Sequence, residues 1–229
     1  MIATDHFIFL HLHTCGDRFV NEFLLRLIPD ARQIGPHLPR RMIPPSLAHL
    51  PSLGFVRNPW RYYAMWYSIH SNRPRSGPLY RVVSESGTLD FEKTMRNLLD
   101  LGVTGSLLNA VQATLPDRFT GVGMNLPAFA LEGIRDSRQG FFSFLYHHIY
   151  DAPGVVHVRR VEHLRADLIQ MLMAVGQPIT AAMRAYAETL DPASPQENDY
   201  TRLYSDSLRD LVAERDAAII AKYSYRFGG

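Results

Sequence analysis

The feature that most constrains the fold is a short apolar run near the start of the chain, followed by a tight turn and a helical pattern. Phe7 to Leu12 is apolar enough for a buried strand, and Gly16 lies in the turn that follows. Apolar residues then recur at helical spacing from Phe19 to Leu27, and Pro29 closes this pattern. A strand, a turn and a helix in this order direct backbone N–H groups and a helix N-terminus toward one place. The sequence therefore predicts an anion site at this turn.

A second strand-to-helix junction follows further along the chain. Leu53 to Val56 is typical of a short strand, Arg57 stands at its end, and Pro59 suits the first turn of a helix. Two such junctions at the edge of a parallel sheet favour a nucleotide-like anion. Arginine binds oxyanions with two parallel N–H groups, so Arg57 is a candidate ligand. The alternative is an ion pair of Arg57 with Glu162 or Asp167.

The remaining pattern alternates between strands and helices. Gly154 to Arg159 predicts a third strand, and one or two more are expected within Gly102 to Pro127. Further helices are predicted from Pro59, over Asp90 to Leu101 with Asp90 as cap, Ser137 to Tyr150, Glu162 to Val175, Pro178 to Leu190 and Leu203 to Tyr223. This alternation predicts an α/β protein with a parallel sheet flanked by helices, in one domain over residues 1–229.

Composition and charge exclude several classes of protein. The net charge is only +2, so a role in coating nucleic acid has no support. Cys15 is the one cysteine, which rules out an intramolecular disulfide and disfavours a cysteine-based zinc site. No apolar run is long enough to span a membrane, and the start of the chain does not resemble a secretory leader. We therefore expect a cytoplasmic protein that has no membrane or nucleic-acid partner.

Several segments together resemble the sulfotransferase family that uses 3′-phosphoadenosine 5′-phosphosulfate as donor. The turn resembles the 5′-phosphosulfate loop of that family, the second junction resembles its 3′-phosphate element, and an aromatic segment resembles one of small bacterial members. The segments are His13 to Asp17, Val56 to Trp60 with Trp66-Tyr67, Gly140-Phe141-Phe142 with Tyr146, Arg160 to Asp167, and Tyr204 to Phe227.

The resemblance implies the P-loop-like fold of that family and the transfer of a sulfuryl group to a hydroxyl or amine of a small molecule or glycan. It implies the phosphosulfate donor as co-substrate and no metal. The residues expected to hold the donor are Thr14, Cys15, Gly16, Asp17 and Arg18 at the 5′-phosphate and Arg57 at the 3′-phosphate. The alternative for Arg18 is an ion pair with Glu22.

The chain departs from the family pattern at several positions. His13 replaces the usual loop lysine, Met65 replaces a serine, and Cys15 replaces the first loop glycine. Asp17 places a negative charge where a phosphate is expected. As an imidazolium, His13 could replace the lysine, and either Asp17 or a bound phosphate would raise its pKa. The alternative is that His13 merely caps the loop.

Other histidines offer further chemistry. His37 lies in the loop after the first helix and could act as general base toward the acceptor hydroxyl, although a structural loop histidine is the alternative. His11 and His13 alternate along the predicted strand and so would share a face. A metal would need a third ligand that the sequence does not fix, so we predict no metal site.

Two rival functions remain from the sequence. Cys15 at a helix N-terminus would have a lowered pKa, which suits a covalent thiol mechanism or another group transfer with His13. The loss of the lysine also suits a binding module that no longer transfers a group. The aromatic-rich helices could in addition form a homodimer.

Overall fold

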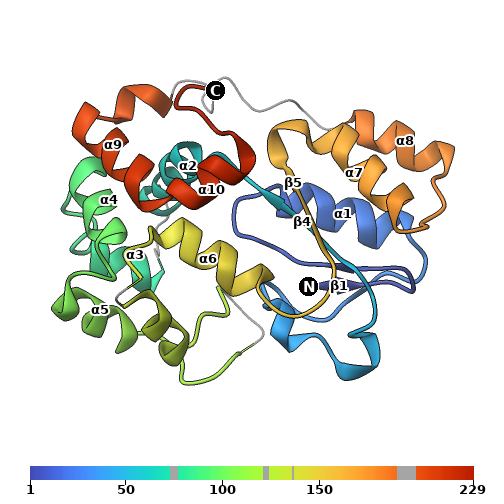
Figure 1. Ribbon diagram of the computed structural model, residues 1–229, viewed down its shortest axis with the longest axis horizontal. Helices are drawn as coiled ribbons and strands as arrows, with labels where there is room; N and C mark the ends of the chain where they lie inside the picture. Colours follow the sequence, from blue (N-terminus) through green and yellow to red (C-terminus); the bar gives the residue numbers. More distant parts are fainter. Residues whose placement is uncertain (73–76, 121–123, 136, 190–199) are drawn as a thin grey trace. The chain divides into compact units, whose positions relative to one another are not determined.

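The computed structural model describes residues 1–72, 77–120, 124–135, 137–189 and 200–229. The described residues form an α/β protein with a five-stranded mixed sheet and flanking helices (Figure 1). Contacts divide the chain into two compact units. The sheet unit comprises Met1–Arg57, Thr120–Asn125 and Tyr146–Pro192, and the helical unit comprises Asn58–Phe119, Leu126–Leu145 and Ala193–Gly229. The single domain expected over residues 1–229 stays a prediction.

The sheet has the strand order β3-β1-β2-β4-β5. The strands are β1 (Ile2–Ala3), β2 (Ile8–Phe9), β3 (Arg32–Gln33), β4 (Ser52–Val56) and β5 (Val156–Arg160). β2, β4 and β5 run parallel, which confirms three expected strands, although β2 is much shorter than Phe7 to Leu12. β1 pairs antiparallel with both β2 and β3, so the expectation of a wholly parallel sheet is wrong.

The two additional strands do not lie where they were expected. The described part of Gly102 to Pro127 contains the helix α5 (Gly105–Gln112) and no strand. β1 and β3 instead belong to the first 33 residues of the chain. A strand of two residues is too short to show an alternating pattern, so neither left a signal in the sequence.

β4 is a buried inner strand of the sheet, between β2 and β5. All five of its residues are buried. Tyr150 packs across it and donates a hydrogen bond of 2.8 Å from its hydroxyl to the carbonyl of Phe55. A Cβ on Gly54 would lie 2.4 Å from that hydroxyl oxygen, so only glycine lets the tyrosine approach. This contact fixes the position of β4, which Arg57 directly follows.

Three helices of the sheet unit pack together beside the strands (Figure 1). They are α1 (Asp17–Leu27), α7 (Leu164–Ala174) and α8 (Ala181–Glu188). Phe19 and Phe23 of α1 contact the ring of Tyr186 on α8, with centroids 5.7 and 6.0 Å apart. The expected helices are confirmed here with shorter bounds, because the turn η4 (Val161–His163) precedes α7, and Leu190 lies outside the described residues.

The helical unit contains most of the other helices. They are α2 (Pro59–Ser71), α3 (Pro78–Val83), α4 (Phe91–Leu99), α5, the 3₁₀ segments η3 (Ala128–Ile134) and η6 (Tyr200–Leu203), α9 (Asp206–Arg215) and α10 (Ala217–Tyr223). The helix α6 (Phe141–Tyr150) is divided between the two units after Leu145. The 3₁₀ turns η1 (Arg40–Met42) and η2 (Pro45–Leu47) belong to the sheet unit.

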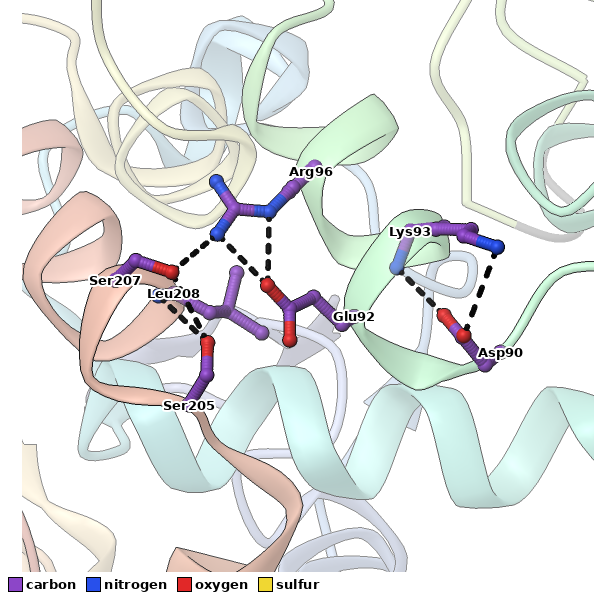
Figure 2. A network of polar contacts seen from close by, with 7 residues as sticks. All are labelled: Asp90, Glu92, Lys93, Arg96, Ser205, Ser207 and Leu208. Atoms are coloured by element: carbon purple, nitrogen blue, oxygen red, sulfur yellow. Dashed lines mark hydrogen bonds and ion pairs between the residues drawn. The ribbon is translucent and has the colours of Figure 1, made fainter.

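A polar network joins α4 to the start of α9 (Figure 2). Arg96 donates to Glu92 Oε1 at 2.8 Å and to Ser207 Oγ at 2.6 Å. Each helix also carries its own cap, since Asp90 accepts from the backbone N–H of Lys93 and Ser205 from that of Leu208. The expected cap at Asp90 is therefore confirmed.

The last predicted helix is broken in the structure. The continuous helix expected from Leu203 to Tyr223 is wrong, because α9 ends and α10 begins at Asp216. The fully buried carboxylate of Asp216 accepts from the N–H and hydroxyl of Ser143, at 2.9 and 2.6 Å, and from the hydroxyl of Tyr63 at 2.9 Å. These bonds satisfy the first turn of α6, which begins at Phe141 rather than Ser137.

Candidate functional site

The turn after β2 has an unusual backbone conformation and packs tightly against the segment after β5. Thr14 and Gly16 both have positive φ angles, of 57° and 79°. A Cβ on Gly16 would also lie 3.1 Å from side-chain carbons of Val161 and Leu164, so this position needs glycine for both its angle and its space. Gly16 immediately precedes α1, whose N-terminus therefore opens at the turn as predicted.

Arg57 links the two predicted junctions. Its side chain is buried at 7% exposure, and its Nε donates a 2.7 Å hydrogen bond to the carbonyl of Thr14. β2 and β4 are parallel neighbours, so their carboxyl ends meet at one edge of the sheet. The structure thus brings together the turn and the arginine that the sequence placed 43 residues apart.

Thr14 also presents a polar side chain in this turn. Its Oγ1 is buried and has no hydrogen-bond partner among the described residues. A buried hydroxyl without a partner loses the hydrogen bonds it would make to water. An incoming oxyanion could supply the missing acceptor.

Two carboxylates lie close to the turn. Asp17 is half-buried in the first turn of α1. Glu162, in η4, has a side chain only 12% exposed and lies 3.9 Å from Nε of Arg160. Both carboxylates act on Cys15, since they help to raise the pKa of its thiol. The site therefore contains anionic groups as well as Arg57, and Glu162 is one of the two carboxylates that the sequence offered as an ion-pair partner of Arg57.

Cys15 differs from its expected chemistry. Its side chain is almost fully buried, and this burial raises the pKa of the thiol. Arg57 lowers that pKa through its charge and its backbone N–H, but the effect of burial is larger. The expectation of a lowered thiol pKa at this helix N-terminus is wrong. The residue is a small buried group, which removes the support for a covalent thiol mechanism.

His13 and His37 form a stacked pair. Their ring centroids are 3.6 Å apart and the rings are inclined by 15°. His37 Nδ1 lies 3.2 Å from the carbonyl oxygen of His11. A carbonyl only accepts, so this bond places the proton on Nδ1 and leaves the lone pair of the neutral ring on Nε2. Burial lowers the pKa of His37, while Asp17 and the His11 carbonyl act in the opposite direction.

His11 is the third histidine of this cluster, and it lies after β2 rather than within a strand. β2 ends at Phe9, so the strand alternation expected for His11 and His13 is wrong. The ring of His11 nevertheless lies 6.0 Å from that of His37, and its Nδ1 is 3.0 Å from the amino nitrogen of Met1. Burial lowers the pKa of His11. Within the described part of the chain, no group of three histidine, cysteine or carboxylate side chains could hold a metal ion.

The structure also gives the locations of Arg18, Glu22 and Met65, which the sequence analysis singled out. Arg18 is exposed on α1. Glu22, its expected partner, accepts a hydrogen bond from Tyr186, and that bond raises the pKa of the tyrosine. Met65 lies on α2 in the helical unit. The contributions of the His11 carbonyl and of Val161 and Leu164 were missed, because backbone acceptors and packing contacts leave no signal in a sequence.

Comparison of the chain with protein-family models, with curated proteins and with solved structures gave no match. Among the helices that the structure describes, none combines the length and the apolar character needed to cross a membrane.

Proposed function

We propose that this chain binds 3′-phosphoadenosine 5′-phosphosulfate and transfers its sulfuryl group to a hydroxyl or amine of a small molecule or glycan. The observation that carries the proposal is the hydrogen bond from Arg57 to Thr14, which brings the two predicted anion-binding junctions into contact. The mixed sheet with three parallel strands is compatible with the sulfotransferase fold. A cytoplasmic location and a homodimer stay predictions.

The donor would be held by backbone and arginine together. We expect the backbone N–H groups of this turn and of the first turn of α1, with the Thr14 hydroxyl, to bind the 5′-phosphate. The N–H of Cys15 is not among them, because it donates to the carbonyl of Leu12 at 3.2 Å. Arg57 supplies the guanidinium for the 3′-phosphate, with its Nε fixed by Thr14. That fixed Nε limits the rotation of the guanidinium, so less entropy is lost when it binds a phosphate.

Transfer needs positioning and charge stabilisation rather than a covalent intermediate. The bond between sulfur and the bridging oxygen breaks, and its electron pair stays on the departing phosphate. A new bond forms between sulfur and the acceptor oxygen, while the hydroxyl proton passes to Nε2 of His37. His13, as an imidazolium, donates to the departing oxygen in place of the usual lysine.

Calorimetry with adenosine 3′,5′-bisphosphate tests the donor assignment. We expect the native protein to bind this nucleotide and Arg57→Ala to weaken binding about 10- to 100-fold, because a hydrogen bond to a charged group is lost. Arg159→Ala is the matched control, since Arg159 is exposed on β5. Absence of binding by the native protein at millimolar nucleotide would contradict the proposal.

A transfer assay separates the enzyme from a binding module. The donor labelled in its sulfuryl group is incubated with a panel of hydroxyl and amine acceptors, and label on any acceptor supports the enzyme. If the nucleotide binds tightly but no label moves, not even slowly to water, the chain is a binding module with the same site. The replacement of the family's loop lysine by His13 is the feature that would favour that outcome.

A further inference from the structure

The stack of His13 on His37 limits the charge that the two rings can carry. At a centroid separation of 3.6 Å, two imidazolium rings would repel each other strongly, and His37 is also half-buried. One imidazolium beside one neutral ring avoids this repulsion. The neutral ring also presents its π face to the charged one. The geometry therefore favours states in which at most one of the two rings is an imidazolium.

The charged groups around the pair, together with its burial, set the pH at which this proton is taken up. The groups that face the pair or the adjoining turn are Asp17 from α1, Glu162 from η4, Arg57 from the end of β4, and His11 and the Met1 amino group from the N-terminal segment. Asp17 raises the pKa of His37, whereas burial and the Met1 amino group lower it. Burial has the largest effect, so it disfavours the charged form of His37 near neutral pH.

We propose that His13 and His37 act as one unit that takes up a single proton when an anion binds at the turn after β2. This inference rests on the proposed function, since the anion is taken to be the phosphates of the nucleotide. During transfer the charged ring of His13 gives its proton to the departing phosphate oxygen while the neutral ring of His37 accepts the hydroxyl proton, so the pair still carries one extra proton. A lysine in place of His13 would be charged throughout and would give no such coupling.

Proton uptake is measured by calorimetry with adenosine 3′,5′-bisphosphate at pH 7.5 in phosphate-free buffers of different ionisation enthalpy. The slope of the binding enthalpy against that ionisation enthalpy counts the protons taken up. We expect close to one proton in the native protein, and an affinity that falls up to tenfold for each pH unit between 7.5 and 8.5. The phosphates of the nucleotide are fully ionised over this range, so they do not mask the effect.

His13→Lys is the decisive variant, and His49→Gln is its matched control because His49 is exposed. The lysine variant is expected to bind without proton uptake and with an affinity that is flat across this pH range, while the control behaves as the native protein. Native binding without proton uptake, or unchanged uptake in His13→Lys, overturns the inference and leaves the proposed function standing. Absence of native binding overturns the proposed function, and the inference with it.

A second variant keeps the test independent of how well His13→Lys folds. His37 has a φ angle of 46°, which asparagine tolerates, and the asparagine amide can also donate to the His11 carbonyl. In His37→Asn, nuclear magnetic resonance should show His13 titrating as a single isolated histidine. In the native protein we expect one coupled step shared by both rings. Two independent full steps in the native protein would overturn the inference.

Discussion

At Cys15, two opposing effects act on the pKa of one thiol. The end of a helix and the charge of Arg57 favour the thiolate, whereas burial in an apolar setting favours the thiol. Sequence position reveals the first effect and hides the second, since burial depends on residues far along the chain. The thiol therefore stays protonated at neutral pH.

This protonation makes a prediction at the scale of the residue. The native protein should react with a thiol reagent at pH 7.5 at least about 100-fold more slowly than the protein unfolded in urea, because the thiol is both buried and protonated. Cys15→Ala should retain nucleotide binding. Labelling of the folded protein at the rate of the unfolded chain would restore Cys15 as a candidate nucleophile.

Among the elements, the strands and helices that were predicted well share one property: their signal is local. α1 follows from the spacing of Phe19 and Phe23, and the start of α4 follows from Asp90. The break at Asp216 has no local signal, because it depends on bonds to Ser143 and Tyr63, about 70 and 150 residues away. The two-residue strands β1 and β3 likewise depend on pairing partners rather than on their own composition.

Asp216 also gives the prediction that belongs to this scale. Burial raises the pKa of its carboxyl from 3.8 to about 6. Because the folded pKa lies above the unfolded one, the stability from this group is fully present below pH 3.8 and is lost as the pH rises through 6. Between pH 4 and pH 7 the free energy of unfolding should therefore fall by about 2 kcal/mol from this group alone.

Urea unfolding at these pH values measures the effect, and Asp216→Asn should remove this component of the pH dependence. Asp210→Asn on α9 is the matched control. Arg209 lowers the pKa of the exposed Asp210, so its contribution has the opposite sign and is lost as the pH falls. If the native protein and Asp216→Asn show the same pH dependence, the carboxyl of Asp216 is not the group that titrates.

For the whole molecule, the candidate site depends on an order of strands that the sequence does not state. The two junctions were recognisable from their residues, but β2 and β4 become neighbours only through the strand order of the sheet. His37 reaches His13 because the segment after β3 returns to the turn. The residues placed in the site (His13, Thr14, Asp17, His37, Arg57 and Glu162) all belong to the sheet unit.

This location of the site predicts where a ligand protects the backbone from hydrogen exchange. Bound adenosine 3′,5′-bisphosphate should slow exchange in peptides covering residues 12–20 and 53–58 by about tenfold or more, because backbone N–H groups there contact the phosphates or support Arg57. Peptides from α4 and α5 in the helical unit provide the internal reference, and we expect no change in them. Protection of residues 53–58 without protection of residues 12–20 would keep Arg57 as an anion ligand and remove the turn after β2 from the site.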